Sequence, residues 1–270
     1  PGFGFRVYMF SARLERVREL SASTRDFRFV RADGETTHYR PGQFFRFEFM
    51  DKDGAFERSY SLCNYDQLFG AELDLVISKV KGGRATALLF SENIEGLEAT
   101  VTGPFGRLVL PEHTPGRLVM VATSVGLAPY IPILRDLESR DYSNVVLLLG
   151  IRDRSEFIYG DLLLEYARKH PWFELRLCLS REAAVASHEY DGYVNAQLEA
   201  MDVNASDDYC LLCGNPKMID EAWTYLRSQD FGAKQVVREK YVFAREKKAV
   251  TKTLTAEQKQ LIAEKMKKYS

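Results

Sequence analysis

The sequence predicts a two-domain protein, in which an N-terminal antiparallel β-barrel is followed by an α/β domain built on a parallel sheet. Its 270 residues are enough for two hydrophobic cores. Up to about Leu110, short strand-like segments alternate with turn residues, which is typical of a small barrel. From Arg117 onward, apolar strands alternate with helical segments, which indicates βαβ units. We therefore assign residues 1–112 to the first domain and residues 113–244 to the second.

The predicted barrel contains six strands and one helix, separated by turns such as residues 32–34 and 51–54. The strands span residues 6–10, 24–30, 44–49, 58–63, 72–80 and 98–102, and the helix spans residues 84–93. The boundary between the domains falls near residues 111–116, where two prolines and a glycine interrupt both patterns.

The predicted α/β domain alternates strands with helices, and a basic extension follows it. The strands span residues 117–122, 144–150, 173–180, 209–213 and 235–241, and the helices span residues 129–140, 161–170, 193–201 and 217–228. Residues 245–270 carry eight Lys and Arg against three Glu, so the net charge of this extension is +5. We expect a helix there, opened by Thr255 as its N-cap residue. It either steers an acidic partner or is a solvated helix packed on the body.

The composition is that of an ordinary globular protein, with 28% charged residues and a net charge of −1. This balance gives no electrostatic footprint for nucleic acid or for a membrane, and no apolar run or signal peptide indicates membrane targeting. The four cysteines, Cys63, Cys178, Cys210 and Cys213, are scattered as in a reducing compartment. No second pair of Cys or His accompanies the Cys210–Cys213 spacing. We therefore expect a cytoplasmic monomer without a metal site.

The first candidate site is the strand segment Arg58-Ser59-Tyr60-Ser61. A guanidinium suits a phosphate, a Tyr ring can lie against a flat ligand, and a Ser hydroxyl can bond a ring nitrogen. Strand alternation would send Arg58 and Tyr60 to one face and the two serines to the other. The alternative is a plain strand with a surface Arg and a cross-strand Tyr.

The second candidate site is the segment of residues 81–86, where Gly82 and Gly83 end a strand and open a helix. Amides at a helix start, with Thr86 in the first turn, can bind an anion. The alternative is an ordinary helix start. Together with Arg58, this segment would hold a pyrophosphate from two sides.

Further candidate residues follow the strands of the second domain. Residues 121–129 and 210–218 both read as strand, turn and helix, and ligands dock where parallel strands end. Arg152 and Arg181 follow two other strands, so they would converge on a phosphate unless they are simple surface residues. Cys213 at its strand end is either part of the site or a buried structural thiol.

The order of these motifs resembles the ferredoxin–NADP(+) reductase family, in its bacterial branch. Arg-x-Tyr-Ser, Gly-Gly-x-x-Thr, a Thr turn with Gly and Pro, Ser-Arg, and Cys-Gly-Asn-Pro occur in sequence between residues 7 and 243. The resemblance implies that the barrel binds FAD and that the α/β domain binds NADP(H). It also implies that electrons pass singly to ferredoxin or flavodoxin, which are small acidic carriers.

The resemblance assigns roles by position. Ser61 would lie near the flavin N5 and Cys213 beside the nicotinamide ring, while Tyr241 or Phe243 would stack on the flavin; these are the expected catalytic residues. The expected FAD-binding residues are Arg58, Ser59, Tyr60, Ser61, Val76, Ile77, Ser78, Lys79, Gly83, Arg84, Ala85 and Thr86. The expected NADP(H)-binding residues are Thr123, Arg152, Ser180, Arg181, Gly214, Asn215 and Pro216, of which Arg152, Ser180 and Arg181 would hold the 2′-phosphate.

Three positions depart from the pattern of this family. Ser124 follows Thr123 where the family has Gly, Tyr193 stands where relatives often have a basic residue, and the chain continues for about 25 residues beyond the final aromatics. Two alternatives therefore remain open. One is an NADH-linked reductase component of an oxygenase, and the other is a non-catalytic flavin-binding subunit that relays electrons.

Overall fold

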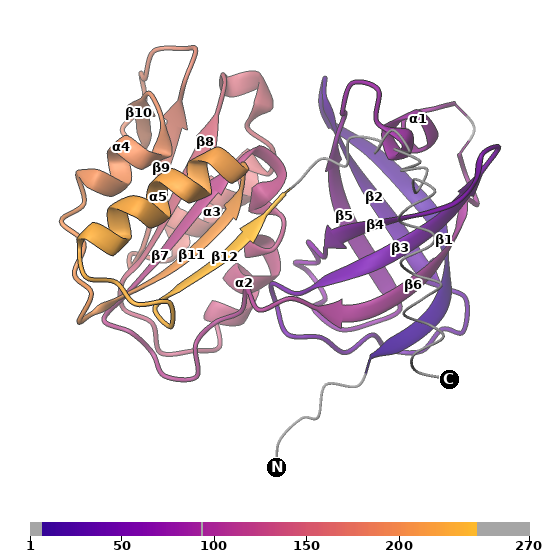
Figure 1. Ribbon diagram of the computed structural model, residues 1–270, viewed down its shortest axis with the longest axis horizontal. Helices are drawn as coiled ribbons and strands as arrows, with labels where there is room; N and C mark the ends of the chain where they lie inside the picture. Colours follow the sequence, from indigo (N-terminus) through magenta and orange to yellow (C-terminus); the bar gives the residue numbers. More distant parts are fainter. Residues whose placement is uncertain (1–6, 93, 242–270) are drawn as a thin grey trace, which may run out of the picture.

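The computed structural model describes residues 7–92 and 94–241, which form two domains side by side (Figure 1). The first domain is a six-stranded antiparallel sheet in the order β4-β3-β6-β1-β2-β5. Its strands are β1 (Tyr8–Ser21), β2 (Thr24–Arg31), β3 (Phe44–Asp51), β4 (Gly54–Ser61), β5 (Glu72–Ser78) and β6 (Glu98–Phe105). A bridge between Leu62 and Leu75 joins the two edges of the sheet, so the sheet curls into a barrel.

Aromatic side chains fill the interior of this barrel. In β3 the residues Phe45, Phe47 and Phe49 are fully buried, whereas the residues between them point to solvent. They pack against Phe27 and Phe29 of β2, and the ring centroids of Phe29 and Phe47 lie 5.4 Å apart. The period of two in the sequence therefore determines which face of β3 forms the core. The short helix α1 (Arg84–Leu89) closes one end of the barrel.

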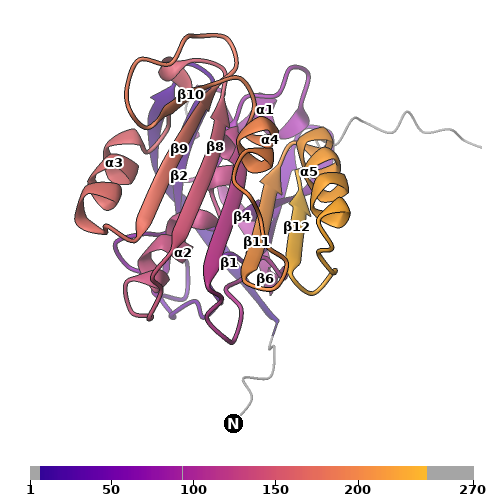
Figure 2. The same cartoon turned by 90° about the vertical axis from the view of Figure 1, so that its left-hand side faces the viewer.

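The second domain is a six-stranded parallel sheet in the order β10-β9-β8-β7-β11-β12. Its strands are β7 (Arg117–Thr123), β8 (Val145–Ile151), β9 (Phe173–Leu179), β10 (Glu189–Asp191), β11 (Asp208–Gly214) and β12 (Val236–Lys240). Its helices are α2 (Tyr130–Leu137), α3 (Gly160–Lys169), α4 (Val194–Glu199) and α5 (Pro216–Ser228), with short 3-10 turns η1 (Ser124–Leu127) and η2 (Arg154–Glu156). Helices α2 and α3 cover one face of the sheet, and α4 and α5 cover the other (Figure 2).

The order of the parallel strands determines where a ligand can bind. After β7 the chain builds outward through β8 and β9, and it later returns to place β11 on the other side of β7. The carboxyl ends of β7 and β11 therefore flank the point where the strand order reverses, which is the usual ligand crevice of an open α/β sheet.

The two domains share a continuous apolar seam. Cys63 and Val76 of the barrel belong to the same buried cluster as Val125 and Ile131 of the second domain. Residues 106–116 connect the domains, and Leu108 from this segment packs into the same cluster. The predicted boundary at residues 112 and 113 lies within this connection.

The predicted fold class is confirmed, but several elements differ in extent. β1 has 14 residues and continues well past the predicted strand, because its second half is charged and carries bulges that hide the alternation. The three-residue strand β10 was not predicted, and α1 is shorter than predicted. Phe243 and the predicted helix within residues 245–270 lie outside the described residues. Within the described chain, no helix is long and apolar enough to cross a membrane.

Candidate functional site

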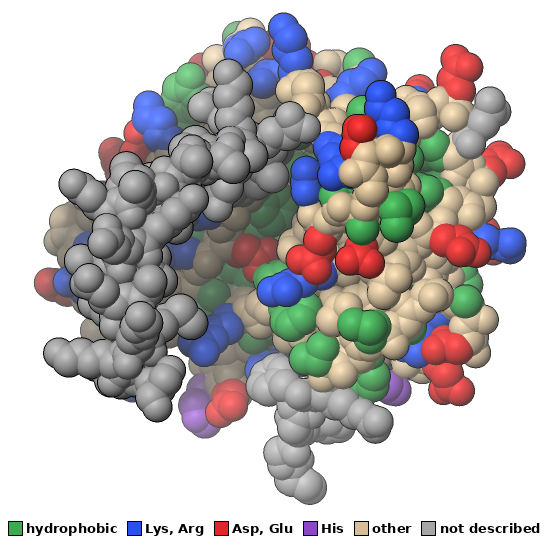
Figure 3. Space-filling model, turned by 45° about the vertical axis from the view of Figure 1, so that its right-hand side comes forward, with side chains coloured by type: hydrophobic (Ala, Val, Ile, Leu, Met, Phe, Trp, Pro, Cys, Tyr) green, Lys and Arg blue, Asp and Glu red, His purple; other side chains and the backbone are tan. Residues whose placement is uncertain are grey.

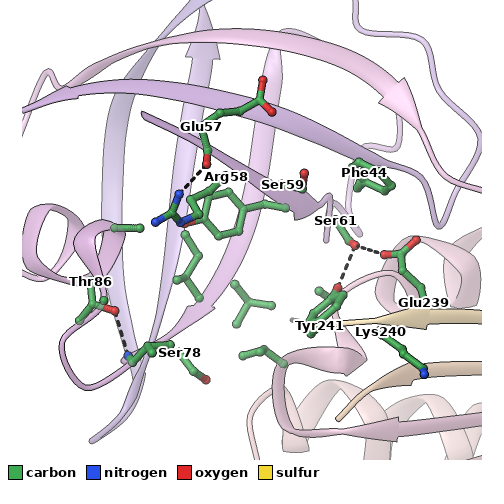
Figure 4. Close-up of a pocket in the computed structure, with 18 of the residues that line it drawn as sticks. Phe44, Glu57, Arg58, Ser59, Ser61, Ser78, Thr86, Glu239, Lys240 and Tyr241 are labelled. Carbon is green, nitrogen blue, oxygen red and sulfur yellow. Dashed lines mark hydrogen bonds between the residues drawn. The ribbon is translucent and has the colours of Figure 1, made fainter. Parts of the chain in front are cut away.

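Two cavities lie where the domains meet. The first, which we call the barrel cavity, has a volume of about 440 Å³ and lies between β4, β5, α1 and the end of β12 (Figure 4). Of the predicted FAD-binding residues all but Lys79 line it, namely Arg58, Ser59, Tyr60, Ser61, Val76, Ile77, Ser78, Gly83, Arg84, Ala85 and Thr86. The structure thus brings together residues from two motifs that are more than twenty positions apart in the sequence.

Arg58 offers positive charge to the barrel cavity. Its Nη1 donates to the carbonyl oxygen of Glu57 at 2.7 Å, and its guanidinium lies 5.2 Å from the Phe56 ring centroid. Among residues 7–92 and 94–241 it has no carboxylate partner within salt-bridge distance. A half-buried guanidinium without an acidic partner is suited to bind an anionic ligand.

The start of α1 forms the opposite wall, and two of its side chains are already engaged. The Arg84 guanidinium binds Asp51 through Nε (2.7 Å) and Nη2 (2.5 Å), and this contact holds the pKa of Asp51 at about 2. The Thr86 hydroxyl accepts a hydrogen bond from the Val80 amide at 2.9 Å. Gly83 is the N-cap residue and supplies no side-chain cap, so the first amides of α1 are available to a ligand.

The four residues of the Arg-x-Tyr-Ser motif alternate as predicted, yet all of them line the barrel cavity. Tyr60 packs edge-on against Phe47 at 5.9 Å, whereas Ser61 is only 4% exposed and Ser59 is exposed. β4 is an edge strand of the sheet, so the cavity reaches both of its faces. Burial raises the pKa of Tyr60 well above its usual value, so its hydroxyl stays protonated.

A cluster of polar side chains lies where the domains touch, and we call Ser61, Cys213, Glu239 and Tyr241 the junction cluster. The Ser61 hydroxyl donates to Glu239 Oε1 at 3.1 Å and lies 2.8 Å from the Tyr241 hydroxyl (Figure 4). Either hydroxyl can donate across the contact between Ser61 and Tyr241, so these two side chains and the Glu239 carboxyl form one hydrogen-bonded chain. The Cys213 thiol is fully buried next to the Tyr241 hydroxyl, and burial raises its pKa well above the usual range.

Glu239 was not among the predicted site residues. Burial raises its pKa to about 7, while the hydrogen bond from Ser61 acts in the opposite direction. β12 is paired with β11, and the register sets Glu239 opposite Cys213. The signal in the sequence was the alternation of the last strand, which puts Glu239 and Tyr241 on the same face. A charged residue in a predicted strand is ordinarily taken as solvent-facing, and this hid the site role of Glu239.

The second cavity, which we call the strand-end cavity, has a volume of about 810 Å³ and lies over the carboxyl ends of the parallel strands. Predicted residues that line it are Ser78, Lys79, Thr123, Arg152, Ser180, Gly214, Asn215 and Tyr241. Arg181, Pro216 and Cys213 do not line either cavity. The Arg181 side chain is exposed, although its amide donates to the Arg152 carbonyl oxygen at 2.8 Å. The role of Arg181 in holding a 2′-phosphate stays a prediction.

Two turns at the base of the strand-end cavity are nested into each other. The Thr123 hydroxyl accepts a hydrogen bond from the Asn215 amide at 2.9 Å. A Cβ on Gly214, which has a φ of 122°, would lie 2.4 Å from Thr123 Oγ1. A Cβ on Gly126 would lie 2.5 Å from the Cys213 carbonyl oxygen. Both glycines are therefore required for the turns after β7 and β11 to approach each other.

Ser124, at the start of η1, adopts a left-handed backbone conformation. Its φ is 51°, in the left-handed region that glycine adopts most readily and other residues adopt at a cost of about 1 kcal/mol. The residue is exposed and lines the strand-end cavity, so its side chain meets solvent and not the nested turns.

The rim of the strand-end cavity carries charges of both signs. Arg152 and Lys217 supply positive charge, and Glu156 and Glu221 supply negative charge. Tyr193, at the position where a third basic residue was expected, is 72% exposed and also lines the rim. In the part of the chain that the structure describes, no group of three or more His, Cys, Asp or Glu could hold a metal ion.

Comparison with known proteins gives matches over both domains. Residues 11–110 match the model of an oxidoreductase FAD-binding domain, and residues 120–223 match that of an oxidoreductase NAD-binding domain. The electron transfer component of toluate 1,2-dioxygenase from Pseudomonas putida is 25% identical over 233 residues, which cover 86% of this chain and 67% of that protein. Ferredoxin–NADP reductase B from Sorangium cellulosum is 29% identical over 221 residues, which cover 78% of this chain and 88% of that protein.

Solved structures agree with these matches. The Amycolatopsis cytochrome P450 reductase GcoB superposes with a TM-score of 0.78 at 26% identity, over 88% of this chain and 71% of that one. The chain spans between 43% and 58% of the length of three relatives that are named as reductase components of monooxygenases.

Proposed function

The chain belongs to the ferredoxin–NADP(+) reductase family of oxidoreductases, and on this premise we propose that it is a FAD-dependent enzyme that exchanges electrons between NADP(H) and a small carrier protein. The carrier would be ferredoxin or flavodoxin. The matching domains bind FAD and a pyridine nucleotide, whereas the choice of NADP(H) and of the carrier is part of the proposal. We also keep the expectation of a monomer as a prediction.

One observation carries the proposal: the two cavities share a wall. Ser78, Val80, Val125 and Tyr241 line both of them, so ligands bound in the two cavities would meet at these residues. Tyr241 is also part of the junction cluster. Bound FAD would supply a two-electron acceptor that can release electrons one at a time.

The residues of the barrel cavity suit FAD. Among the described residues Arg58 has no carboxylate within salt-bridge distance, and it lies across the cavity from the uncapped start of α1, so the two can hold a pyrophosphate from both sides. Tyr60 and Tyr241 offer aromatic surface next to the Ser61 hydroxyl. The backbone of β5 around Ile77 supplies the remaining wall.

At the junction the chain positions groups and holds protons. Glu239 keeps its proton up to about pH 7 and accepts a hydrogen bond from Ser61, so the cluster can carry one proton at the Glu239 carboxyl near neutral pH. The Tyr241 backbone amide donates to the Gly214 carbonyl oxygen at 2.8 Å, which ties the end of β12 to the nested turns. Burial of the Cys213 thiol keeps water from this side of the junction.

The preference for NADP(H) is supported by Arg152 and Ser180 on the rim of the strand-end cavity. A second candidate is an NADH-linked reductase component of an oxygenase, and specific observations favour it. Glu221 lies on the same rim, Tyr193 stands where a basic residue was expected, and several relatives carry oxygenase names. The relay subunit suggested by Ser124 is the third candidate.

The test is anaerobic mixing of the FAD-loaded protein with NADPH and, separately, with NADH, followed by flavin absorbance. Fast bleaching by NADPH alone supports the proposal, and fast bleaching by NADH supports the oxygenase component. If neither nucleotide bleaches a flavin that dithionite reduces, the protein is a relay subunit. Ferredoxin and flavodoxin are then compared as acceptors under steady turnover.

The barrel side of the molecular surface has mixed charge. Figure 3 shows basic and acidic side chains interspersed over one face of the barrel side, with Lys and Arg gathered along its upper rim. Because association steered by charge slows as salt is added, the salt dependence of carrier reduction measures how much this face contributes.

A further inference from the structure

The two domains are fastened at one corner by hydrogen bonds that the proposed function does not use. Glu156, the last residue of η2, accepts hydrogen bonds from the hydroxyls of Ser21 (2.9 Å) and Ser23 (2.8 and 3.1 Å). Ser21 ends β1 and Ser23 lies in the turn before β2, so these bonds join the second domain to the barrel. We call the contact of Glu156 with Ser21 and Ser23 the latch.

Tyr159, three residues further on, strengthens the same corner. Its hydroxyl donates to Asp26 Oδ2 on β2 at 3.1 Å and lies 3.4 Å from Cys63 Sγ. Asp26 is only 2% exposed and also accepts from Arg18 at 2.8 Å. Tyr159 has a φ of 55°, a conformation that a residue with a side chain keeps only where its surroundings hold it.

The latch forms part of the wall of the strand-end cavity. Glu156 and Ser23 both line that cavity. From Ser23 a line of hydroxyls continues to Thr24 (3.4 Å) and from Thr24 to Ser78 (2.9 Å), and Ser78 lines both cavities. The latch thus connects the nucleotide-binding domain to the barrel residue at which the two cavities meet.

We propose that Glu156 is a positioning residue for electron transfer, because the latch fixes the separation at which a nucleotide in the strand-end cavity reaches the junction cluster. This inference rests on the proposed function. The apolar seam holds the domains together but is non-directional, whereas hydrogen bonds to a carboxylate define direction and distance. A misplacement of about 1 Å between reacting groups can cost roughly 100-fold in rate. Loss of the latch therefore acts on the rate at saturation, and nucleotide affinity changes little.

The first variant is Glu156→Ala in the full-length, FAD-loaded protein. We expect the limiting rate of flavin bleaching by the preferred nucleotide to fall about tenfold or more. The dissociation constant of the oxidised nucleotide, from difference spectra, should change by less than about threefold. Flavin content and unfolding temperature are measured alongside.

The conservative variant Glu156→Gln should restore most of the rate. Its amide oxygen can accept from one serine while its amino group donates to the other, so the latch survives without the charge. Replacing both partners, Ser21→Ala with Ser23→Ala, should slow bleaching as much as Glu156→Ala. Adding Glu156→Ala to that pair should cause no further loss, since the groups act as one unit.

Glu182→Ala is the matched control. The Glu182 carboxylate accepts from the Arg154 amide at 2.8 Å, so it holds the same turn η2. Glu182 lines neither cavity, and within residues 7–92 and 94–241 its hydrogen bonds join it to Arg154 and not to the barrel. The limiting rate of flavin bleaching in Glu182→Ala should equal that of the unaltered protein.

Three results would overturn the inference. One is an unchanged limiting rate in Glu156→Ala while the unaltered protein bleaches fast. Another is Glu156→Gln behaving like Glu156→Ala with a changed ratio of NADPH to NADH use, which would mean that the charge contacts the nucleotide. If the unaltered protein is bleached by dithionite but by neither nucleotide, the proposed function fails and the inference fails with it. If Glu156→Ala does not fold, the limiting rates of Glu156→Gln and of the double variant Ser21→Ala with Ser23→Ala still test the inference.

Discussion

The barrel cavity and the strand-end cavity are built by different parts of the chain. In the barrel cavity, a strand edge and a helix start present Arg58, which has no carboxylate within salt-bridge distance among the described residues, although Glu57 and Glu239 also line the cavity. In the strand-end cavity, backbone turns locked by Gly126 and Gly214 form the base, and side chains of both signs form the rim. The barrel cavity thus offers an anionic ligand a side-chain guanidinium and a helix start, whereas the base of the strand-end cavity is formed by backbone turns whose shape is fixed by glycines.

The largest expected effect comes from crowding the nested turns with Gly214→Ala. The added Cβ would lie 2.4 Å from Thr123 Oγ1 at a φ of 122°, so the turns must separate. We expect a loss of about 3 kcal/mol or more in unfolding free energy, and reduction by nucleotide should fail while FAD still binds. Thermal unfolding and anaerobic bleaching measure both.

Gly34→Ala is the control, because Gly34 has a φ of 70° and nothing lies within 4 Å of its added Cβ. The loss of unfolding free energy in this variant therefore measures backbone strain without crowding. An equal loss of unfolding free energy in Gly34→Ala and Gly214→Ala would show that the turns after β7 and β11 are not packed closely at Gly214.

Glu239→Gln tests the junction cluster, where the two domains touch. The folded pKa of about 7 lies above the ordinary value of 4.5, so between these values the folded state binds more protons than the unfolded state. Stability of the unaltered protein should therefore fall as pH rises from about 4.5 to 7, by at most about 3 kcal/mol. The Gln variant should lack this fall. Denaturant unfolding at pH 5 and pH 8 measures it, and parallel pH curves for the two proteins would show that Glu239 is not buried as a carboxyl.

Arg58→Ala should affect the barrel cavity alone. A hydrogen bond to a charged group contributes about 1.5–3 kcal/mol, so the dissociation constant of FAD should rise roughly 10- to 150-fold. Fluorescence titration of the apoprotein with FAD measures this. Arg46→Ala is the control, because Arg46 is an exposed arginine on β3 that does not line the cavity. Equal affinities for the two variants would remove Arg58 from the site.

The smallest effect concerns the rim of the strand-end cavity. Arg152→Ala should lower the ratio of kcat/KM for NADPH over NADH by about tenfold, because the 2′-phosphate loses a charged donor. Arg181→Ala should have a smaller effect, since its side chain does not line the cavity. Arg176→Ala, which removes a partner of Glu174 on β9, is the control. A ratio that stays constant in both Arg152→Ala and Arg181→Ala would favour the NADH-linked enzyme.

The sequence predicted the parts of the fold that depend on local pattern. Alternation in β3 and the apolar strands of the second domain follow directly from side-chain spacing, and so does the grouping of strand ends at one edge. The motif Arg58 to Ser61 was recognisable because its chemistry lies within four consecutive residues.

What could not be predicted depends on contacts between distant residues. The pairing of Arg84 with Asp51 joins positions 33 apart, and the latch joins Glu156 to Ser21 across 135 residues. Glu239 is charged in a strand that reads as half-exposed, and only the packing of β12 against the barrel buries it. The pairing of Arg84 with Asp51 follows from how the barrel closes, and the contacts of Glu156 and Glu239 follow from how the domains meet. No local pattern in the sequence encodes either.

The nested turns have a consequence for how this enzyme can change over evolutionary time. A Cβ on Gly214 would occupy space that Thr123 fills, so a larger residue at position 214 requires a smaller one at position 123, and a single substitution at Gly214 is blocked. The rim residues Arg152 and Tyr193 are exposed and lack such constraints. Preference for one nucleotide over another can therefore drift by single substitutions, while the arrangement that brings the two ligands together is inherited unchanged.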